Sequence, residues 1–158
     1  ALLFAASFLL HELAHKAEAQ SHGLWAEFRI NLQSALITLI SIISPFKLIA
    51  PGAVVVAGFA TPSVVARIAL VGPLVNLVMG GVLYALALIT PGMWRLVLVS
   101  GAYVNAIMAV FNLIPFSILD GHKIFTLNRR SWIKAFTASV ILLALVIWSF
   151  FLVWRPLF

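Results

Sequence analysis

The chain has 158 residues, of which 64% are hydrophobic and only 9% are charged. Soluble domains have about a quarter of their residues charged, and a soluble protein of the present composition would expose a large apolar surface and aggregate. Intrinsic disorder is excluded too, because it requires low hydrophobicity. The composition therefore predicts an integral membrane protein with a single domain over residues 1–158.

The net charge of +6 does not indicate a nucleic-acid partner, because no basic run with interleaved aromatic residues is present. We expect the lipid bilayer to be the partner, with basic residues in cytoplasmic loops. The absence of cysteine excludes disulfides and thiolate metal ligands. The chain starts at Ala1 within an apolar run, and we expect it to be a core fragment of a longer protein.

A first helix is predicted over residues 1–20. Its first ten residues are almost entirely apolar, and charged residues follow from Glu12 onward. Ten apolar residues cover only about half of a bilayer. This helix therefore either lacks its beginning or has ionisable groups at membrane depth.

Residues 22–60 have a different pattern, which predicts a strand, a short helix and a second strand. Residues 24–29 lack a helical period, and residues 51–58 are rich in β-branched valines and bounded by proline and glycine. Between them, residues 32–44 are apolar but too short to span, so a re-entrant or interfacial helix is expected. Open strands cannot face lipid, so we expect a small β-hairpin at the cytoplasmic surface.

Three later segments, 68–89, 96–116 and 135–154, contain no charged residue. Each has about the 20 residues that cross a hydrocarbon core of about 30 Å. The predicted fold is an all-α polytopic membrane protein with about four transmembrane helices.

The distribution of basic residues predicts the orientation in the membrane. Eight of the ten lie between the first and second or the third and fourth predicted helices, whereas Arg95 and Arg155 lie on the opposite side. Because cytoplasmic loops are enriched in Lys and Arg, the loops at 16–67 and 120–134 are expected to be cytoplasmic.

Residues 11–15, His-Glu-Leu-Ala-His, form an HExxH motif. On a helix, His11 and His15 lie about 40° apart and about 6 Å along the axis, so both imidazoles can reach one metal ion. Glu12 can then accept a proton from a water molecule at the metal, which is the general-base role in metalloproteases. Ionisable groups at membrane depth are usually functional, which favours a site over a polar helix end.

A catalytic zinc site usually has three protein ligands, so one more is required. The spacing alone leaves five candidates for it. These are Glu18, His22, Glu27, Asp120 and His122. Asp120 is the only acidic residue after Glu27, and it lies toward the cytoplasmic end of its helix, as the HExxH motif does.

Three motifs together resemble the site-2 protease family of intramembrane zinc metalloproteases. They are HExxH at 11–15, Gly-Pro-Leu-Val-Asn at 72–76, and Asn112-x-x-Pro115 followed by Leu-Asp-Gly at 119–121. They occur in the family's order over essentially the whole chain. The chain differs from many members in having Ile118 before the Leu-Asp-Gly motif.

The resemblance implies a single Zn²⁺ ion bound by His11, His15 and Asp120, with Glu12 as the catalytic glutamate. It implies hydrolysis of a peptide bond in or near the transmembrane segment of a single-span membrane protein. It also implies a prokaryotic cell membrane as the location, with the active site toward the cytoplasm.

Further candidate residues concern the substrate. The motifs suggest that Asn112 and Asn76 hydrogen-bond the substrate backbone or the developing oxyanion. Residues 51–58 resemble the hairpin that this family places beside the site. Its valines, Val54, Val55 and Val56, would offer an edge on which an extended substrate docks.

Two other functions remain open from the sequence. A metal transporter or metal-binding membrane protein could use the same histidines and aspartate, although it would not need Glu12 and would more often have inverted repeats. A catalytically inactive family member could bind membrane helices without cutting them.

Overall fold

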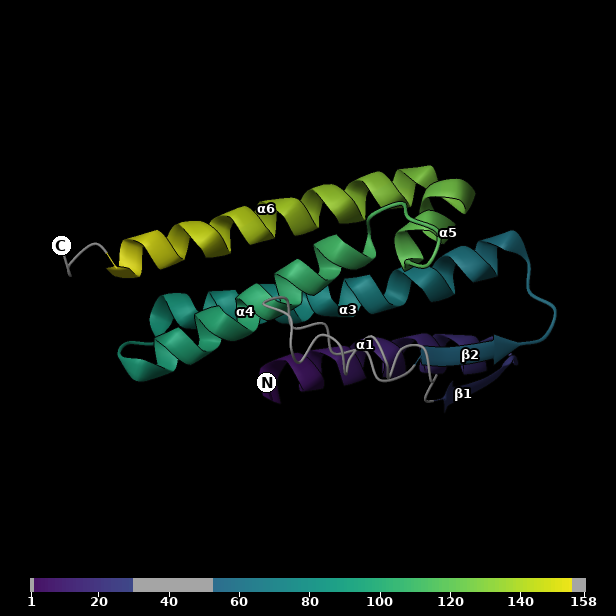
Figure 1. The fold of residues 1–158 in the computed structure, drawn as a ribbon, viewed down its shortest axis with the longest axis horizontal. Coiled ribbons are helices and arrows are strands. Elements are labelled where there is room, and N and C mark those ends of the chain that lie inside the picture. The colour runs from purple at the N-terminus through teal and green to yellow at the C-terminus, as the bar shows by residue number, and fades with distance from the viewer. Residues whose placement is uncertain (1, 30–52, 155–158) are drawn as a thin grey trace, which may run out of the picture.

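The computed structural model describes residues 2–29 and 53–154 and is mostly helical (Figure 1). The predicted helix at 32–44 lies outside these residues. The elements, in chain order, are α1 (Leu2–Ser21), β1 (Trp25–Arg29), β2 (Ala53–Ala57), α3 (Pro62–Ile89), α4 (Met93–Asn112), α5 (Asp120–Leu127) and α6 (Arg129–Trp154).

Within the described part of the chain, three helices are long and apolar enough to cross a membrane. They are α3, α4 and α6 up to Phe150, and they correspond to the three uncharged segments of the sequence. The expected fourth span is not confirmed. The second half of α1 contains Glu12, Lys16 and Glu18, and these charges lower its hydropathy.

The helix ends differ from the expected ones for local reasons. Helix α3 begins at Pro62 rather than at residue 68, because Thr61 caps it and its hydroxyl accepts a hydrogen bond from the backbone N–H of Val64. Helix α4 ends at Asn112, before Pro115, since a proline disfavours helical backbone at the residue preceding it. Helix α5 was expected to be a loop.

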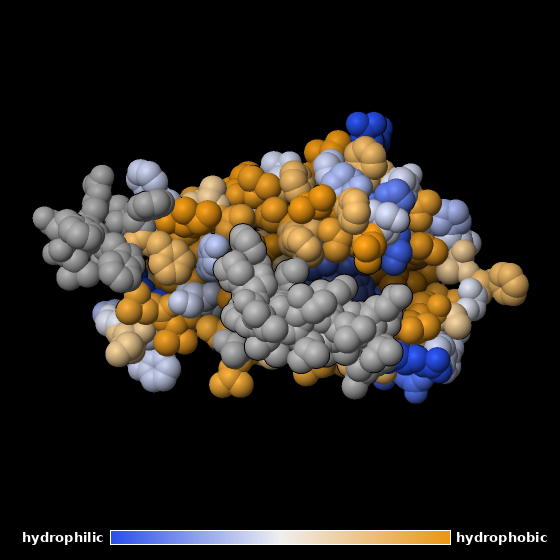
Figure 2. Space-filling view, viewed as in Figure 1, coloured by the Kyte–Doolittle hydropathy of each residue, from blue (hydrophilic) through white to orange (hydrophobic). Residues whose placement is uncertain are grey.

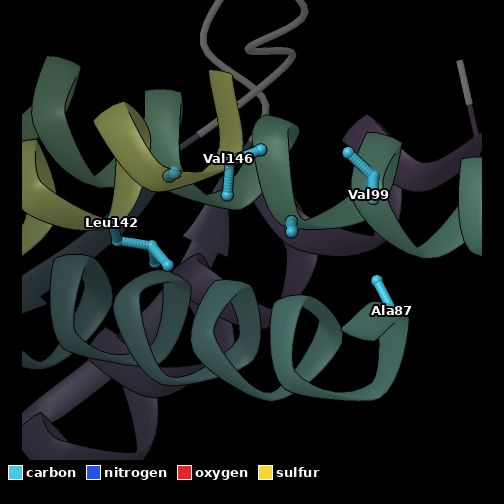
Figure 3. Packing of buried hydrophobic residues seen from close by; sticks show 6 residues of the cluster. Ala87, Val99, Leu142 and Val146 are labelled. Carbon is cyan, nitrogen blue, oxygen red and sulfur yellow. The ribbon is translucent and has the colours of Figure 1, made fainter. Parts of the chain in front are cut away.

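Helix α3 is the central element of the bundle. It contacts α1, α4, α5 and α6, and Figure 1 shows it between α1 on one side and α6 on the other. Small side chains allow the helices to approach closely. Figure 3 shows one such contact, where Ala87 of α3 and Val99 of α4 belong to the same buried cluster as Leu142 and Val146 of α6.

Strands β1 and β2 form an antiparallel pair that lies against α1 (Figure 1). Trp25 is opposite Ala57 and Arg29 is opposite Ala53. Both expected strands are therefore present, each slightly shorter than the segment predicted for it. Strand β2 has α1 beside it, which brings its backbone close to the HExxH motif.

Hydrophobic residues dominate the face shown in Figure 2. The most hydrophilic residues gather mainly toward the end of the molecule that contains α5 and the two strands in Figure 1. This distribution is the one expected when apolar helices are surrounded by lipid and one end of the bundle lies in water.

The corner between α4 and α5 is formed by close backbone contact. The indole Nε1–H of Trp132, on α6, donates to the carbonyl of Leu113 at 2.7 Å. Gly121 lies so close to this turn that an added Cβ would be 2.3 Å from the Leu113 carbonyl carbon and oxygen. The absence of a side chain at Gly121 thus allows α5 to begin directly beside the end of α4.

We predict that Gly121→Ala destabilises the protein by about 1–3 kcal/mol, the usual cost of overpacking, because α5 must shift away from Leu113. Gly81→Ala, in an open position of α3, should be neutral or slightly stabilising because alanine favours helix. Thermal unfolding in detergent, followed by circular dichroism, compares the two variants. Equal melting temperatures would show that α5 adapts without cost.

Candidate metal centre

The two histidines of the HExxH motif lie on the buried face of α1. His11 is 2% exposed and His15 is 7% exposed, and they share this face with Ser7 and Ala19. The spacing of four residues places them one turn apart and on one side of the helix. Their Nε2 atoms are 3.0 Å apart, so both imidazoles point to one place.

Asp120 joins the two histidines from the opposite end of the sequence. It is the first residue of α5, and the turn after α4 brings its Oδ2 atom to 3.0 Å from His15 Nε2 and 3.3 Å from His11 Nε2. The described residues contain one group of three or more potential metal-binding side chains, and it is this one.

The opposite ring nitrogen of each histidine is bound by the surrounding helices. His15 Nδ1 donates to the carbonyl of Ile68 on α3 at 2.6 Å, and His11 Nδ1 is 2.6 Å from the side-chain oxygen of Asn76 on the same helix. A carbonyl oxygen can only accept, so Nδ1 carries the hydrogen in both rings. The lone pair of each neutral imidazole is therefore on Nε2, where a metal would bind it.

Asp120 is suited to be the anionic ligand. Burial of its carboxyl would raise its pKa, but the hydrogen bonds that His11 and His15 donate from Nε2 when they are protonated, together with their positive charge in that state, outweigh the burial and keep that pKa well below its usual range. The carboxyl is therefore ionised at neutral pH.

Gly72 of α3 allows the two imidazoles to lie against the helix backbone. A Cβ added at Gly72 would be 2.3 Å from His15 Nε2 and 2.7 Å from His11 Nε2. A side chain at this position would therefore occupy the space into which the two Nε2 atoms point.

The donor set matches a tetrahedral zinc ion. Two ligands bound at about 2.0–2.1 Å in this geometry lie about 3.3 Å apart, close to the 3.0–3.3 Å observed here. Nitrogen and carboxylate ligands are those that zinc accepts. Three protein ligands leave a fourth position, as in catalytic rather than structural zinc sites.

The three candidate ligands line a cavity. This cavity has a volume of about 370 Å³ and is also lined by Glu12 and by Asn112 of α4. Glu12 is half-buried, and one of its carboxylate oxygens accepts a hydrogen bond from the backbone N–H of Val54 at 2.9 Å. The carboxylate therefore lies beside strand β2 and lines the same cavity as the candidate ligands.

The other candidates for the third ligand lie elsewhere. Glu18 and His22 pair with each other at 3.2 Å, and Glu27 pairs with Arg29 on the exposed face of β1. His122 is exposed on α5. These side chains are paired with other residues or exposed to solvent, so Asp120 is the candidate third ligand that lies beside the two histidines.

The suggested substrate contacts fall into two groups. Asn112 lines the cavity, as do Val54 and Val56. Asn76 is completely buried behind His11, and Val55 is opposite Glu27 of β1. Because N–H groups alternate along a strand, the contact of Val54 with Glu12 turns the N–H of Val55 toward β1. The substrate-binding roles of all five residues stay predictions.

Three contacts of this site were not predicted from the sequence. These are the Ile68 carbonyl on His15, the Val54 N–H on Glu12, and Asn105, which contacts Asn76. The first two are backbone groups, so no residue type could have indicated them. The polar Asn105 on an apolar helix is the one signal in the sequence that could have indicated the third contact.

We predict that Asp120→Ala loses bound zinc, since two histidines alone leave the ion without its anionic ligand. His122→Ala, two residues further along α5 and exposed, should retain one zinc per chain. Metal analysis of the purified, dialysed variants measures both. Stoichiometric zinc in Asp120→Ala, or its loss in His122→Ala alone, would show that the third ligand is wrong.

Comparison with known proteins supports a metal site of this kind. No protein-family model matches the chain, and no solved structure matches it. A protein of Methanocaldococcus jannaschii named "putative zinc metalloprotease" is 34% identical over 129 residues, which cover 79% of this chain and 68% of that protein. Because the similarity extends over most of both sequences, the chain belongs to the same family of zinc metalloproteases.

Proposed function

We propose that the protein is an intramembrane zinc endopeptidase of the site-2 type, which hydrolyses a peptide bond in or near the transmembrane segment of a single-span membrane protein. The observation that carries the proposal is the convergence of His11, His15 and Asp120 beside Glu12 and an open cavity. This centre belongs to a bundle with three helices long and apolar enough to cross a membrane. The motifs at 11–15, 72–76 and 112–121 support the site-2 type.

The proposed location is a prokaryotic cell membrane, with the site toward the cytoplasm. The excess of basic residues in the segments 16–67 and 120–134 supports this orientation. The site belongs to the end of the bundle with β1, β2 and α5, where most of the hydrophilic residues gather (Figure 2). Water can therefore enter from that end without crossing the apolar part.

Zinc, when bound by the three ligands, would supply a Lewis acid that polarises the peptide carbonyl and makes water more acidic. Glu12 is the base within the cavity. Its carboxylate accepts a proton from the attacking water and can return it to the leaving amide nitrogen. The water adds across the C–N bond, so one product has a new carboxyl group and the other a new amine.

Asn112 can assist at the carbonyl oxygen. Its Nδ2 atom donates one hydrogen to the Met108 carbonyl at 3.0 Å, and an amide nitrogen has a second hydrogen to donate. Because Asn112 lines the cavity with Glu12, this hydrogen is available to a substrate oxygen that gains negative charge during attack.

Strand β2 can receive the substrate in extended form. A peptide carbonyl within an intact helix is hydrogen-bonded and shielded by side chains, so the substrate helix must unwind before it is cut. Unwinding in lipid leaves backbone groups unpaired, at several kcal/mol each. Val56 has its N–H on the edge of β2 away from β1, next to the Val54 N–H that already donates to Glu12, and such an edge can pair with an added strand.

We predict that Glu12→Gln abolishes cleavage while zinc and fold are retained. Glutamine is nearly isosteric but cannot accept the proton, and loss of a general base costs about 10²–10⁴ in rate. Glu18→Gln is the matched control on the same helix, and its activity should equal that of the wild type. The assay uses purified protein, zinc and a panel of single-span substrates.

Substantial cleavage by Glu12→Gln would remove Glu12 from the mechanism. Zinc binding without cleavage of any substrate by the wild type would instead favour metal transport or an inactive relative that binds membrane helices.

We predict that Val56→Pro slows cleavage about 2–10-fold, the effect of one lost hydrogen bond, because proline has no N–H on the docking edge. Val56→Ala shortens the side chain but keeps the N–H and should cleave at nearly the wild-type rate. The loss should be larger for a leucine-rich substrate helix than for one with Gly and Pro near the cleaved bond, which unwinds more easily. Identical rates for the two variants would exclude β2 as the docking edge.

A further inference from the structure

Asn76 is a buried polar residue for which the proposed reaction has no direct use. It lies on α3, is completely buried, and uses its amide in three directions. Its Nδ2 atom donates to the Ser7 carbonyl at 3.3 Å and to Asn105 Oδ1 at 3.0 Å. Its Oδ1 atom faces His11 Nδ1 at 2.6 Å.

These contacts allow the amide one orientation. The Ser7 carbonyl can only accept, so the Asn76 nitrogen must face it and the oxygen must face His11. Because that oxygen can only accept, the hydrogen of His11 is required on Nδ1. The orientation of Asn76 therefore determines which nitrogen of His11 has the free lone pair.

Asn105 of α4 fixes Asn76 in turn. Its Nδ2 atom donates to the Gly101 carbonyl at 2.9 Å, which leaves Oδ1 directed at Asn76. Asn105 is only 3% exposed, so water does not compete for these bonds. A chain of two amides thus connects the backbone of α4 to the imidazole of His11.

We infer that Asn76, oriented by Asn105, is a positioning residue that keeps His11 in the tautomer and ring orientation required for metal binding through Nε2. His15 needs no such residue, because its Nδ1 donates to the backbone carbonyl of Ile68. The inference deepens the proposed function and depends on it only in requiring a metal at this site. Partners of metal-bound histidines typically affect metal affinity 10–100-fold.

Helix packing is the competing explanation, since buried amides also join helices within apolar bundles. The variants Asn76→Asp and Asn76→Leu distinguish helix packing from the positioning of His11. Aspartate keeps an oxygen acceptor for His11 Nδ1 but buries a charge opposite Asn105 Oδ1, which destabilises the fold. Leucine has a similar volume and removes the acceptor.

The experiment measures the zinc affinity of the full chain by chelator competition, and the melting temperature of the metal-free protein. If Asn76 positions His11, Asn76→Leu binds zinc 10–100-fold more weakly than the wild type. Asn76→Asp then binds zinc with nearly the wild-type affinity, although its melting temperature is lower than that of Asn76→Leu. If Asn76→Asp, the less stable of the two variants, also binds zinc more weakly than Asn76→Leu, the inference is overturned in favour of helix packing.

Two further variants keep the test decisive if Asn76→Leu does not fold. Asn105→Leu leaves Asn76 in place but removes one of the two hydrogen bonds that orient it, and should weaken zinc binding about 2–10-fold. Ser139→Ala removes a buried polar group on α6 whose hydroxyl donates to the Ala135 carbonyl of its own helix, and should not change zinc affinity. Unchanged affinity in Asn105→Leu would count against the inference, whereas absence of zinc from the wild type would count against the proposed function.

Discussion

The structure depends on one electrostatic constraint, the convergence of three lone pairs at one point. His11 Nε2, His15 Nε2 and Asp120 Oδ2 lie 3.0–3.3 Å from one another in a buried site, where repulsion is weakly screened. A divalent cation among them converts this repulsion into attraction. The packing of α1 and α5 against α3 is what keeps the three atoms together, and Gly72 and Gly121 allow the required approach.

Among the described residues, the buried polar side chains of α1, α3 and α4 are concentrated at the same place. In an apolar environment each unpaired polar group costs free energy, and the buried amides near the site are accordingly hydrogen-bonded. Asn76 and Asn105 bond to each other and to backbone carbonyls, and Asn76 contacts His11. Further from the site, the buried cluster between α3, α4 and α6 consists of alanine, valine and leucine (Figure 3).

The features that could be predicted from the sequence are those that depend on local spacing. The HExxH period places His11 and His15 on one helix face, and long uncharged segments indicate the helices that can cross a membrane. Asp120 was selected among five candidates by its motif and isolation in the sequence. The contacts of Glu12 with Val54 and of His11 with Asn76 could not be predicted, because they depend on how separate elements approach. The edge of β2 that faces away from β1 shows the same limit, since a shift of the strand by one residue would place the N–H of Val55 there instead of that of Val54.

The wide separation of the candidate ligands along the chain has a consequence for biosynthesis. Chains are synthesised from the N-terminus and their parts fold in that order, and His15 precedes Asp120 by 105 residues. A nascent chain that ends before α5 has two imidazoles and Glu12 but no third ligand. The hydrolytic centre can therefore assemble only after α3 and α4 have been made and α5 has packed beside Leu113. Proteolytic activity would then first appear only after α1, α3 and α4 have been made and have packed together.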